Sequence, residues 1–277
     1  MNNSQHMEKT IEFSPFQLLM CLSFFLLISF YLVLVGISIH HHKRWSIYRV
    51  LLWVVGIFCA MGAVTGPIAN QGHNNFTMHM VGHLLLGMLA PLLLVLAAPM
   101  TLLLRTLHVI PARFIARLLK STPLFLISSP IVASLLNIGG LLLIYTSNLF
   151  EMMQHNLVIH LIVHFHIFLA GYVFTAAFIY IDPRPHRTSF FHRAIVLIFA
   201  FTGHNILSKY IYAHPPDGVS IEQGKTGGML MYYGGDAIDL IFIIIFCFQW
   251  YNASLPKGFN LSRASKKNQH ITKTLHR

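Results

Sequence analysis

The stretch HMVGHLLLGMLAPLLLVLAAPMTLLL (residues 79–104) contains no Lys, Arg, Asp or Glu, although it carries two histidines. A helix needs only about 20 mostly apolar residues to cross the hydrocarbon core of a bilayer. Four further runs lack charged residues in the same way, namely 16–39, 121–150, 194–208 and 240–256. Only 10% of the whole chain is charged, whereas a soluble domain has roughly a quarter of its residues charged. These features indicate an integral membrane protein.

The apolar runs predict an all-α fold, a polytopic membrane helical bundle with about seven transmembrane helices. The first run follows a polar lead and shows no small-residue cleavage pattern, so we expect a retained helix rather than a signal peptide. We expect a single integral membrane domain over residues 1–277. The expected helices cover residues 16–39, 47–66, 79–103, 124–147, 156–180, 190–212 and 232–251.

Basic residues give the expected orientation, because cytoplasmic loops carry an excess of Lys and Arg. Placing 40–49, 104–123, 181–193 and the tail from Lys257 inside puts 16 of the 19 Lys and Arg in the cytoplasm. We therefore expect a multi-pass protein of the cell membrane with an extracytoplasmic N-terminus and a basic cytoplasmic tail at 257–277.

The net charge of +11 does not indicate a nucleic-acid partner, because the basic residues sit beside membrane helices. Residues 111–121 place Arg113, Arg117 and Lys120 on one helical face and apolar residues on another, which predicts an interfacial helix on the anionic inner leaflet. The expected partner of this surface is the lipid bilayer. The three cysteines have no spacing typical of a metal or disulfide framework.

Histidine is frequent, with 18 residues, and five of them fall on the extracytoplasmic side of three expected helices. Two HxxxH pairs place their histidines at i and i+4, so each pair shares one helix face. Ionisable groups at membrane depth usually face the interior of a bundle. Neutral imidazole suits copper, zinc, iron and nickel. We therefore predict a metal site made of His79, His83, His160, His164 and His204.

Six further residues of the same region are candidates for additional ligands or for groups that orient a ligand. The two aspartates near the start of the last expected helix could bind metal, orient a histidine or cap that helix. A methionine thioether favours Cu(I), although methionine is also a common packing residue. A membrane histidine can likewise serve as a structural hydrogen-bond donor. The six residues are Asp236, Asp239, His155, His166, Met80 and Met231.

The run His79-Met80-Val81-Gly82-His83-Leu84-Leu85, continuing into APLLLVLAAPMTLLLR, resembles the signature helix of the CtaG family. The segment with Glu222-Gln223 followed by Gly227-Gly228-Met229-Leu230-Met231-Tyr232 is also similar to that family, with Tyr232 where tryptophan is common. The family consists of assembly factors for caa(3)-type cytochrome c oxidase. The resemblance implies a role in respiratory chain biogenesis, with cytochrome c oxidase subunits as partners and a copper ion as the metal delivered.

The residues alone leave other functions open. His83 and His164 on facing helices could ligate haem axially. A metal- or proton-linked transporter would need ionisable residues through the inner half of the bilayer, where these helices carry few. A di-metal enzyme of the histidine-box type would place its ligands on the cytoplasmic face. We find no nucleophile–base arrangement and no nucleotide-binding loop, and we expect a protein that is not an enzyme.

Overall fold

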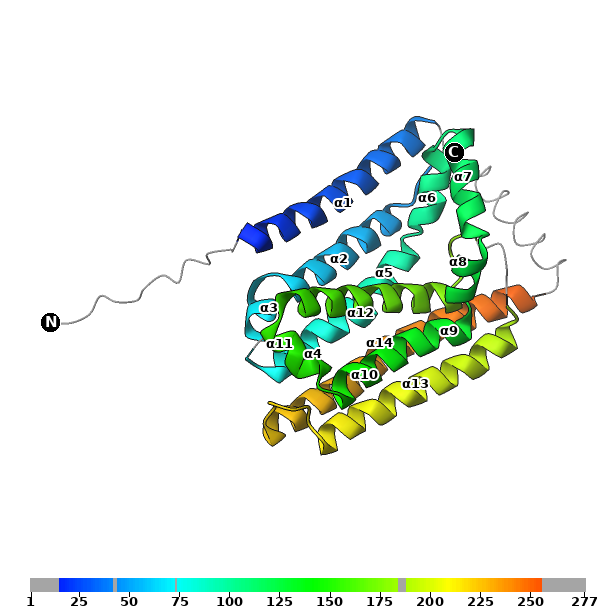
Figure 1. The fold of residues 1–277 in the computed structure, drawn as a ribbon. Helices are drawn as coiled ribbons and strands as arrows, with labels where there is room; N and C mark the ends of the chain where they lie inside the picture. Colours follow the sequence, from blue (N-terminus) through cyan, green and yellow to red (C-terminus); the bar gives the residue numbers. More distant parts are fainter. Residues whose placement is uncertain (1–14, 42–43, 73, 184–187, 256–277) are drawn as a thin grey trace, which may run out of the picture.

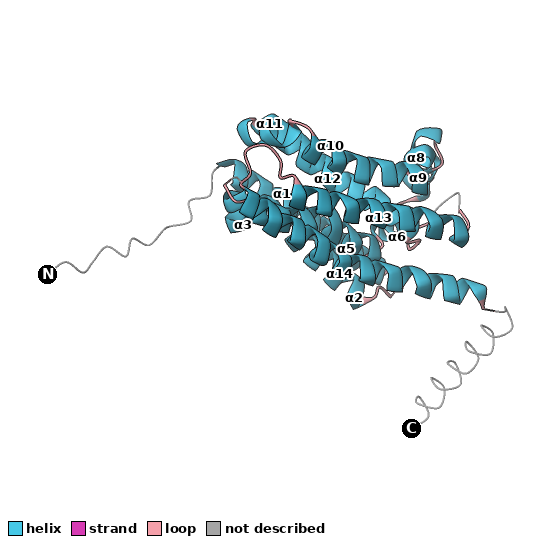
Figure 2. Ribbon diagram, turned by 90° about the horizontal axis from the view of Figure 1, so that it is seen from below, coloured by secondary structure: helices cyan, strands magenta, loops and turns pink. Residues whose placement is uncertain are grey.

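The computed structural model describes residues 15–41, 44–72, 74–183 and 188–255, and every regular element in these ranges is a helix (Figures 1 and 2). The bent pair Pro130–Thr146 and Leu149–His155, with an angle of 77° between its parts, makes a seventh span if it is counted as one. The predicted all-α bundle of about seven transmembrane helices is therefore confirmed. The six helices long and apolar enough to cross a membrane are Gln17–His40, Ile47–Gly72, Phe76–Leu96, Leu157–Phe178, Phe190–Ala213 and Ile221–Ser254.

The segment Phe76–Leu96 lies at the centre of the bundle. It is 67% buried, whereas the first span is only 11% buried and presents most of its apolar side chains outward. The central segment packs against α2 (Ile47–Val64), α12 (Leu157–Phe178) and α14 (Ile221–Ser254). Figure 1 shows α1 (Pro15–His40) at the edge of the molecule beside α2. The charge-free stretch with two histidines is thus surrounded by protein.

The sequence predicted one continuous helix over residues 79–103, but the central span is divided. It consists of α4 (Phe76–His83), the π-helical turn η1 (Leu84–Leu89) and α5 (Ala90–Leu96), and the chain then breaks before α6 (Pro99–Thr106). Ala98 adopts a left-handed conformation with φ of 55°. The break precedes Pro99, and proline disfavours helical backbone in the residue before it.

The expected helix 124–147 is also divided. It consists of α8 (Thr122–Ile127), α9 (Pro130–Ser134), the π-helical turn η2 (Leu135–Gly139) and α10 (Gly140–Thr146). Ser129 caps α9 by accepting a hydrogen bond from the backbone N–H of Val132 at 3.3 Å. The expected loop at 148–155 is mostly the short helix α11 (Leu149–His155), and α3 (Gly66–Gly72) follows α2. Short helices therefore replace two simple elements of the expected layout.

The last helix, α14, begins at Ile221, well before the expected residue 232, and Ser220 caps it by accepting from the N–H of Gln223. Asp236 and Asp239 consequently lie about four and five turns inside the helix rather than at its start. The interpretation of these aspartates as helix caps is wrong. The preceding helix, α13 (Phe190–Ala213), has nearly the expected bounds.

The basic amphipathic segment forms α7 (Val109–Leu119). Arg113, Arg117 and Lys120 are exposed, and so are Phe114 and Leu118 at 64% and 51%. A helix that exposes both basic and large apolar side chains fits the predicted position at a membrane surface.

The orientation stays a prediction, and its tail segment 257–277 lies outside the described residues. We expect Ser265→Cys, in a variant without Cys21, Cys59 and Cys247, to resist a membrane-impermeant thiol reagent in intact cells, because the 16-to-3 distribution of basic residues places the tail inside. The same cysteine should react after the cells are opened. Labelling of residue 265 in sealed cells would reverse the assigned orientation.

Candidate functional site

Helix α4 holds His79 and His83 in the interior of the bundle, where their exposures are 8% and 4%. Asn75 caps the helix by accepting from the N–H groups of Thr77 and Met78. The side-chain oxygen of Gln223, in the first turn of α14, accepts from the N–H of Phe76 at 3.0 Å. These contacts join the starts of α4 and α14 and fix the two histidines in the interior.

The five predicted histidines form a row of neighbouring rings. His160 and His164 stack within α12, with their ring centres 4.1 Å apart. His164 also lies edge-on to His79 at 6.1 Å, across the boundary between α12 and α4. At the other end of the row, His83 stacks on His204 of α13, with ring centres 6.3 Å apart.

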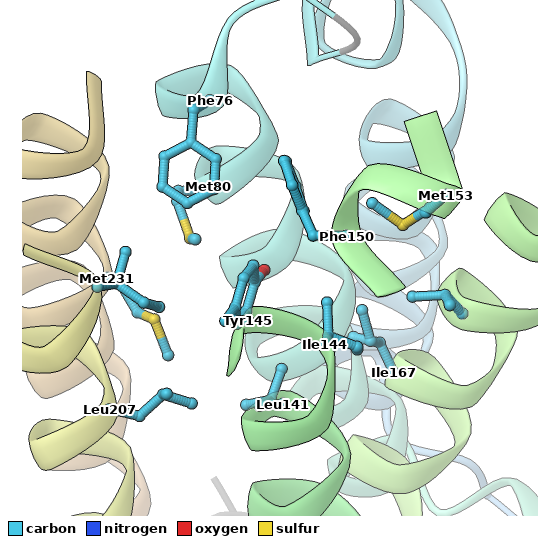
Figure 3. Packing of buried hydrophobic residues seen from close by; sticks show 12 residues of the cluster. Phe76, Met80, Leu141, Ile144, Tyr145, Phe150, Met153, Ile167, Leu207 and Met231 are labelled. Atoms are coloured by element: carbon cyan, nitrogen blue, oxygen red, sulfur yellow. The ribbon is translucent and has the colours of Figure 1, made fainter. Parts of the chain in front are cut away.

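Tyr145 connects the two ends of this row. Its hydroxyl lies 3.1 Å from Nε2 of His79, and its ring is 6.4 Å from that of His83. Tyr145 is 2% exposed and belongs to α10. Figure 3 shows its hydroxyl directed toward α4, among the buried side chains of the hydrophobic cluster. A single phenol thus contacts both histidines of α4.

Burial increases along the row. His160 and His164 are half-buried, whereas His83 and His204 are 4% and 3% exposed. Nδ1 of His164 lies 2.9 Å from the carbonyl oxygen of His160. Because a carbonyl only accepts, Nδ1 carries the proton in this contact and Nε2 holds the lone pair. The imidazole of His164 is therefore held against the backbone of α12.

The inner end of the row borders a cavity of about 30 Å³. A volume of this size exceeds the roughly 10–15 Å³ that one water molecule needs. Its polar or sulfur-bearing lining residues come from five separate segments of the chain. They are His83, Met88, Asn137, Thr175, His204 and Asp239.

The two histidines at this cavity receive no hydrogen bond on their ring nitrogens from the described part of the chain. Both ring nitrogens of His83 and both of His204 are buried and have no hydrogen-bond partner among the described residues. The same holds for Oδ2 of Asp239, a residue that is 6% exposed. An unpaired buried polar group costs about 1–3 kcal/mol. Five such atoms around one cavity indicate a place where a ligand completes the bonding.

Both π-helical turns border this cavity. η1 follows His83 directly and contributes Met88, while η2 contributes Asn137. π-helical turns occur mostly inside longer helices and are frequent at functional sites. Here they place side chains of two different spans at the same point.

The position of His204 depends on Gly235 of α14. A Cβ atom at residue 235 would lie 2.6 Å from Cε1 of His204. Glycine is therefore required there for the imidazole to lie against α14 and reach the cavity.

The six residues predicted as additional ligands or orienting groups lie in different surroundings. Asp239 lines the cavity, whereas Asp236 accepts a hydrogen bond from Nδ2 of Asn205 at 3.1 Å. His166 lies 3.3 Å from the carbonyl oxygen of Leu136, which is the structural role considered for it. His155 is exposed at the end of α11.

The two methionine candidates belong to the hydrophobic core. Met80 and Met231 are fully buried in the cluster that also contains Phe76 (Figure 3). Neither lines the cavity, and the methionine that does is Met88.

Sequence reasoning missed Tyr145, Met88, Asn137 and Thr175. Asn137 is a polar residue inside a charge-free run and could have been noticed for that reason. The others have no distinguishing spacing, and only the packing of α10, η1 and α12 brings them to the histidines.

The structure does not bring all five histidines to one point. Within the ranges that the structure describes, no group of three or more His, Cys, Asp or Glu residues is arranged to hold a metal ion. The predicted common centre is replaced by two neighbouring pairs, one at the outer and one at the inner end of the row.

The family model for cytochrome c oxidase caa3 assembly factors (Caa3_CtaG) matches residues 29–253, which include every residue of the histidine row and the cavity. The chain belongs to this family. The match confirms the resemblance found in the sequence, and the members of this family are assembly factors for the caa3 oxidase.

Three mycobacterial proteins are similar to this Caa3_CtaG chain over 165 residues, or 57% of its length. They are the uncharacterized protein ML1998 of Mycobacterium leprae (27% identical), Mb0105 of Mycobacterium bovis (31%) and MT0111 of Mycobacterium tuberculosis (31%). The matched region covers only 25% of each of these relatives. No solved structure matches the chain.

The two segments that carry the resemblance to the Caa3_CtaG family touch each other. Besides the bond from Phe76 to Gln223, a Cβ at Gly227 would lie 2.6 Å from the ring of Phe76. Glycine at 227 therefore lets α14 lie close against the start of α4, which carries the histidines.

Proposed function

We propose that this protein supports maturation of a haem–copper cytochrome c oxidase by holding a copper ion as cargo at the cavity between His83, His204 and Asp239. The family supplies the oxidase as the partner. The copper and the residues that hold it are inferred from the chemistry of the site.

One observation carries the proposal. His83 and His204 face each other at 6.3 Å, with four buried ring nitrogens that have no partner among the described residues. The unpaired carboxylate oxygen of Asp239 lies at the same cavity. Imidazole and carboxylate bind divalent copper, and the thioether of Met88 suits Cu(I). This donor set fits a copper ion in either oxidation state.

The rings must reorient to share an ion, because an imidazole binds a metal through a lone pair in its ring plane and these two rings are stacked with 25° between their planes. Metal–nitrogen bonds of about 2 Å place the centres of two imidazoles on one metal roughly 5–6 Å apart. The observed 6.3 Å is longer, in keeping with the finding that the described residues hold no preformed group of three ligands. A site that closes only partly around its ion suits a protein that must release it.

The outer histidines provide an approach to this cavity. The row begins at the half-buried part of α12 and leads to the buried His83. Its rings follow one another in space in the order His160, His164 and His79. We infer that copper enters at the half-buried pair and exchanges ligands toward the cavity, without crossing the bundle.

Haem fits this arrangement less well than copper. Pockets for ligands of drug size measure roughly 300–1,000 Å³. The cavity beside His83 has about 30 Å³, and the nearest imidazole partner of His83 is His204 rather than His164.

We expect metal-free purified protein, titrated with Cu(I) against a competing chelator, to bind about one copper ion strongly and to show no haem absorbance. Asp239→Asn should weaken copper binding about tenfold, because it removes charge at the cavity. Asp236→Asn is the matched control, since that carboxylate binds Asn205. Absence of copper binding, or equal affinities for the two variants, would contradict the proposed site.

A further inference from the structure

Tyr145 lies between the two ends of the histidine row and is held there by aromatic packing. Its ring meets that of Phe76 edge-on, with centres 6.2 Å apart, and lies 6.1 Å from that of Phe150 (Figure 3). Tyr145 is the second-last residue of α10, and the chain then bends by 77° into α11, which carries Phe150. The packing of α4, α10 and α11 therefore fixes the position of the phenol.

The hydroxyl of Tyr145 occupies one of the two ring nitrogens of His79, because it lies 3.1 Å from Nε2. If Nε2 carries the proton, it donates to the phenol oxygen, and if Nδ1 carries the proton, Nε2 accepts from the phenol. A metal binds a neutral imidazole through the lone pair of a ring nitrogen. In either tautomer, copper can bind Nε2 of His79 only after the bond to Tyr145 is broken.

This bond decides how many imidazoles the outer end of the row can offer to a metal. His79 lies 6.1 Å from His164, which is close to the roughly 5–6 Å between the centres of two imidazoles on one metal. His160 stacks on His164, so His79 would be the third imidazole at that end. A further ligand on the same scaffold raises the affinity for an ion without any other new contact. With Nε2 of His79 occupied, the outer end holds an ion less tightly.

We propose that Tyr145 keeps Nε2 of His79 occupied and thereby makes the outer histidines a transient binding site for copper. The inference rests on the proposed function, in which copper enters at this end of the row and moves to the cavity beside His83. An ion held by two imidazoles is released more readily than an ion held by three, and the returning bond from Tyr145 favours its release from His79. Tyr145 is a positioning residue, because it acts on copper through His79.

The test is a titration of the purified, metal-free full chain with Cu(I) against a competing chelator, with His83→Ala and His204→Ala present throughout. Both cavity imidazoles are then missing, so the binding that remains reports on the outer histidines. Tyr145→Phe should raise the copper affinity about tenfold, the factor that corresponds to losing a competing hydrogen bond of ordinary strength. Phenylalanine keeps the ring and its packing against Phe76 and Phe150. A merely structural role would give weaker binding, so the sign of the change separates the two roles.

Two further variants assign the gain in affinity to His79. His79→Ala, added to Tyr145→Phe, should abolish the gain, because the nitrogen that the phenol occupied is then missing. Tyr210→Phe is the matched control and should leave the affinity unchanged, because Tyr210 stacks on His214, outside the histidine row.

Three results would overturn the proposal. They are an unchanged or lower affinity in Tyr145→Phe, a gain that persists when His79→Ala is added, and an equal gain in Tyr210→Phe. Every protein in this titration lacks the two cavity imidazoles. A failure of the cavity site therefore appears in the titration of Asp239→Asn, and a failure of the role of Tyr145 appears in this one.

Discussion

His83→Ala is expected to leave the protein in the membrane at normal abundance and to reduce cytochrome c oxidase activity at least about tenfold. The substitution removes one of the two buried imidazoles at the cavity, and loss of a ligand weakens metal binding strongly. Removing a polar group from an apolar helix does not oppose membrane insertion. His204→Ala should have the same effect, since its ring faces that of His83. Oxidase activity and the copper content of the oxidase, measured at matched levels of the variant proteins, provide the test.

His192→Ala is the matched control and should be silent, because His192 lies in the first turn of α13, far along the helix from His204. Added copper should partly restore the His83→Ala strain if delivery is what fails. Full oxidase activity in both His83→Ala and His204→Ala would show that the pair is structural. Low activity with a normal copper content of the oxidase would assign the protein to assembly without metal transfer.

Gly171→Ala is expected to be the most destabilising single methyl addition in the bundle. A Cβ at residue 171 of α12 would overlap the carbonyl oxygen of Gly87 and lie 3.2 Å from the ring of Pro91. The overlapping atom belongs to the backbone of η1, so a side-chain rotation cannot relieve the clash and the two helices must separate. Overpacking of this kind costs typically about 1–3 kcal/mol. The expected result is a lower Tm in detergent, with secondary loss of copper binding because η1 follows His83.

Gly139→Ala separates this clash from the general effect of replacing glycine in a helix. Its added Cβ would meet no atom within 4 Å, so the substitution should be neutral or stabilising by up to about 1 kcal/mol through helix propensity alone. Equal Tm values for Gly171→Ala and Gly139→Ala would show that α12 and η1 pack less closely than described.

Much of this protein could be predicted from local sequence. Charge-free runs of sufficient length give the membrane spans, because the hydrocarbon core excludes ionised side chains along the whole crossing. The i, i+4 spacing of His79 and His83 places both on one helix face, and the same holds for His160 and His164. The segments around His83 and Gly227 carried the family resemblance, which the family match confirms.

The residues at which helices end and begin were harder to predict from the sequence. Pro99 lies inside an apolar run that hydropathy alone reads as one span, yet it ends the helix because its ring disfavours helical backbone at Ala98. The early start of α14 was hidden because Ile221–Met231 contains polar residues and glycines that are typical of a loop. Its cap at Ser220 and its packing against α4 stabilise the helix there. Asp239 was expected near the start of this helix and instead lies well inside it, at the cavity.

The sequence by itself determined that the chain is a bundle of membrane helices and that five of its 18 histidines fall toward the same end of three of them. Both follow from properties of short segments, namely hydrophobic length and helical periodicity. Only the tertiary structure decided which histidines meet. His83 pairs with His204 because Gly235 lets the imidazole lie against α14, and Met88, Asn137 and Asp239 join them because two π-helical turns and a long helix pack at that point. Such contacts join residues far apart in the chain, and helical periodicity cannot specify which face of one helix meets which face of another.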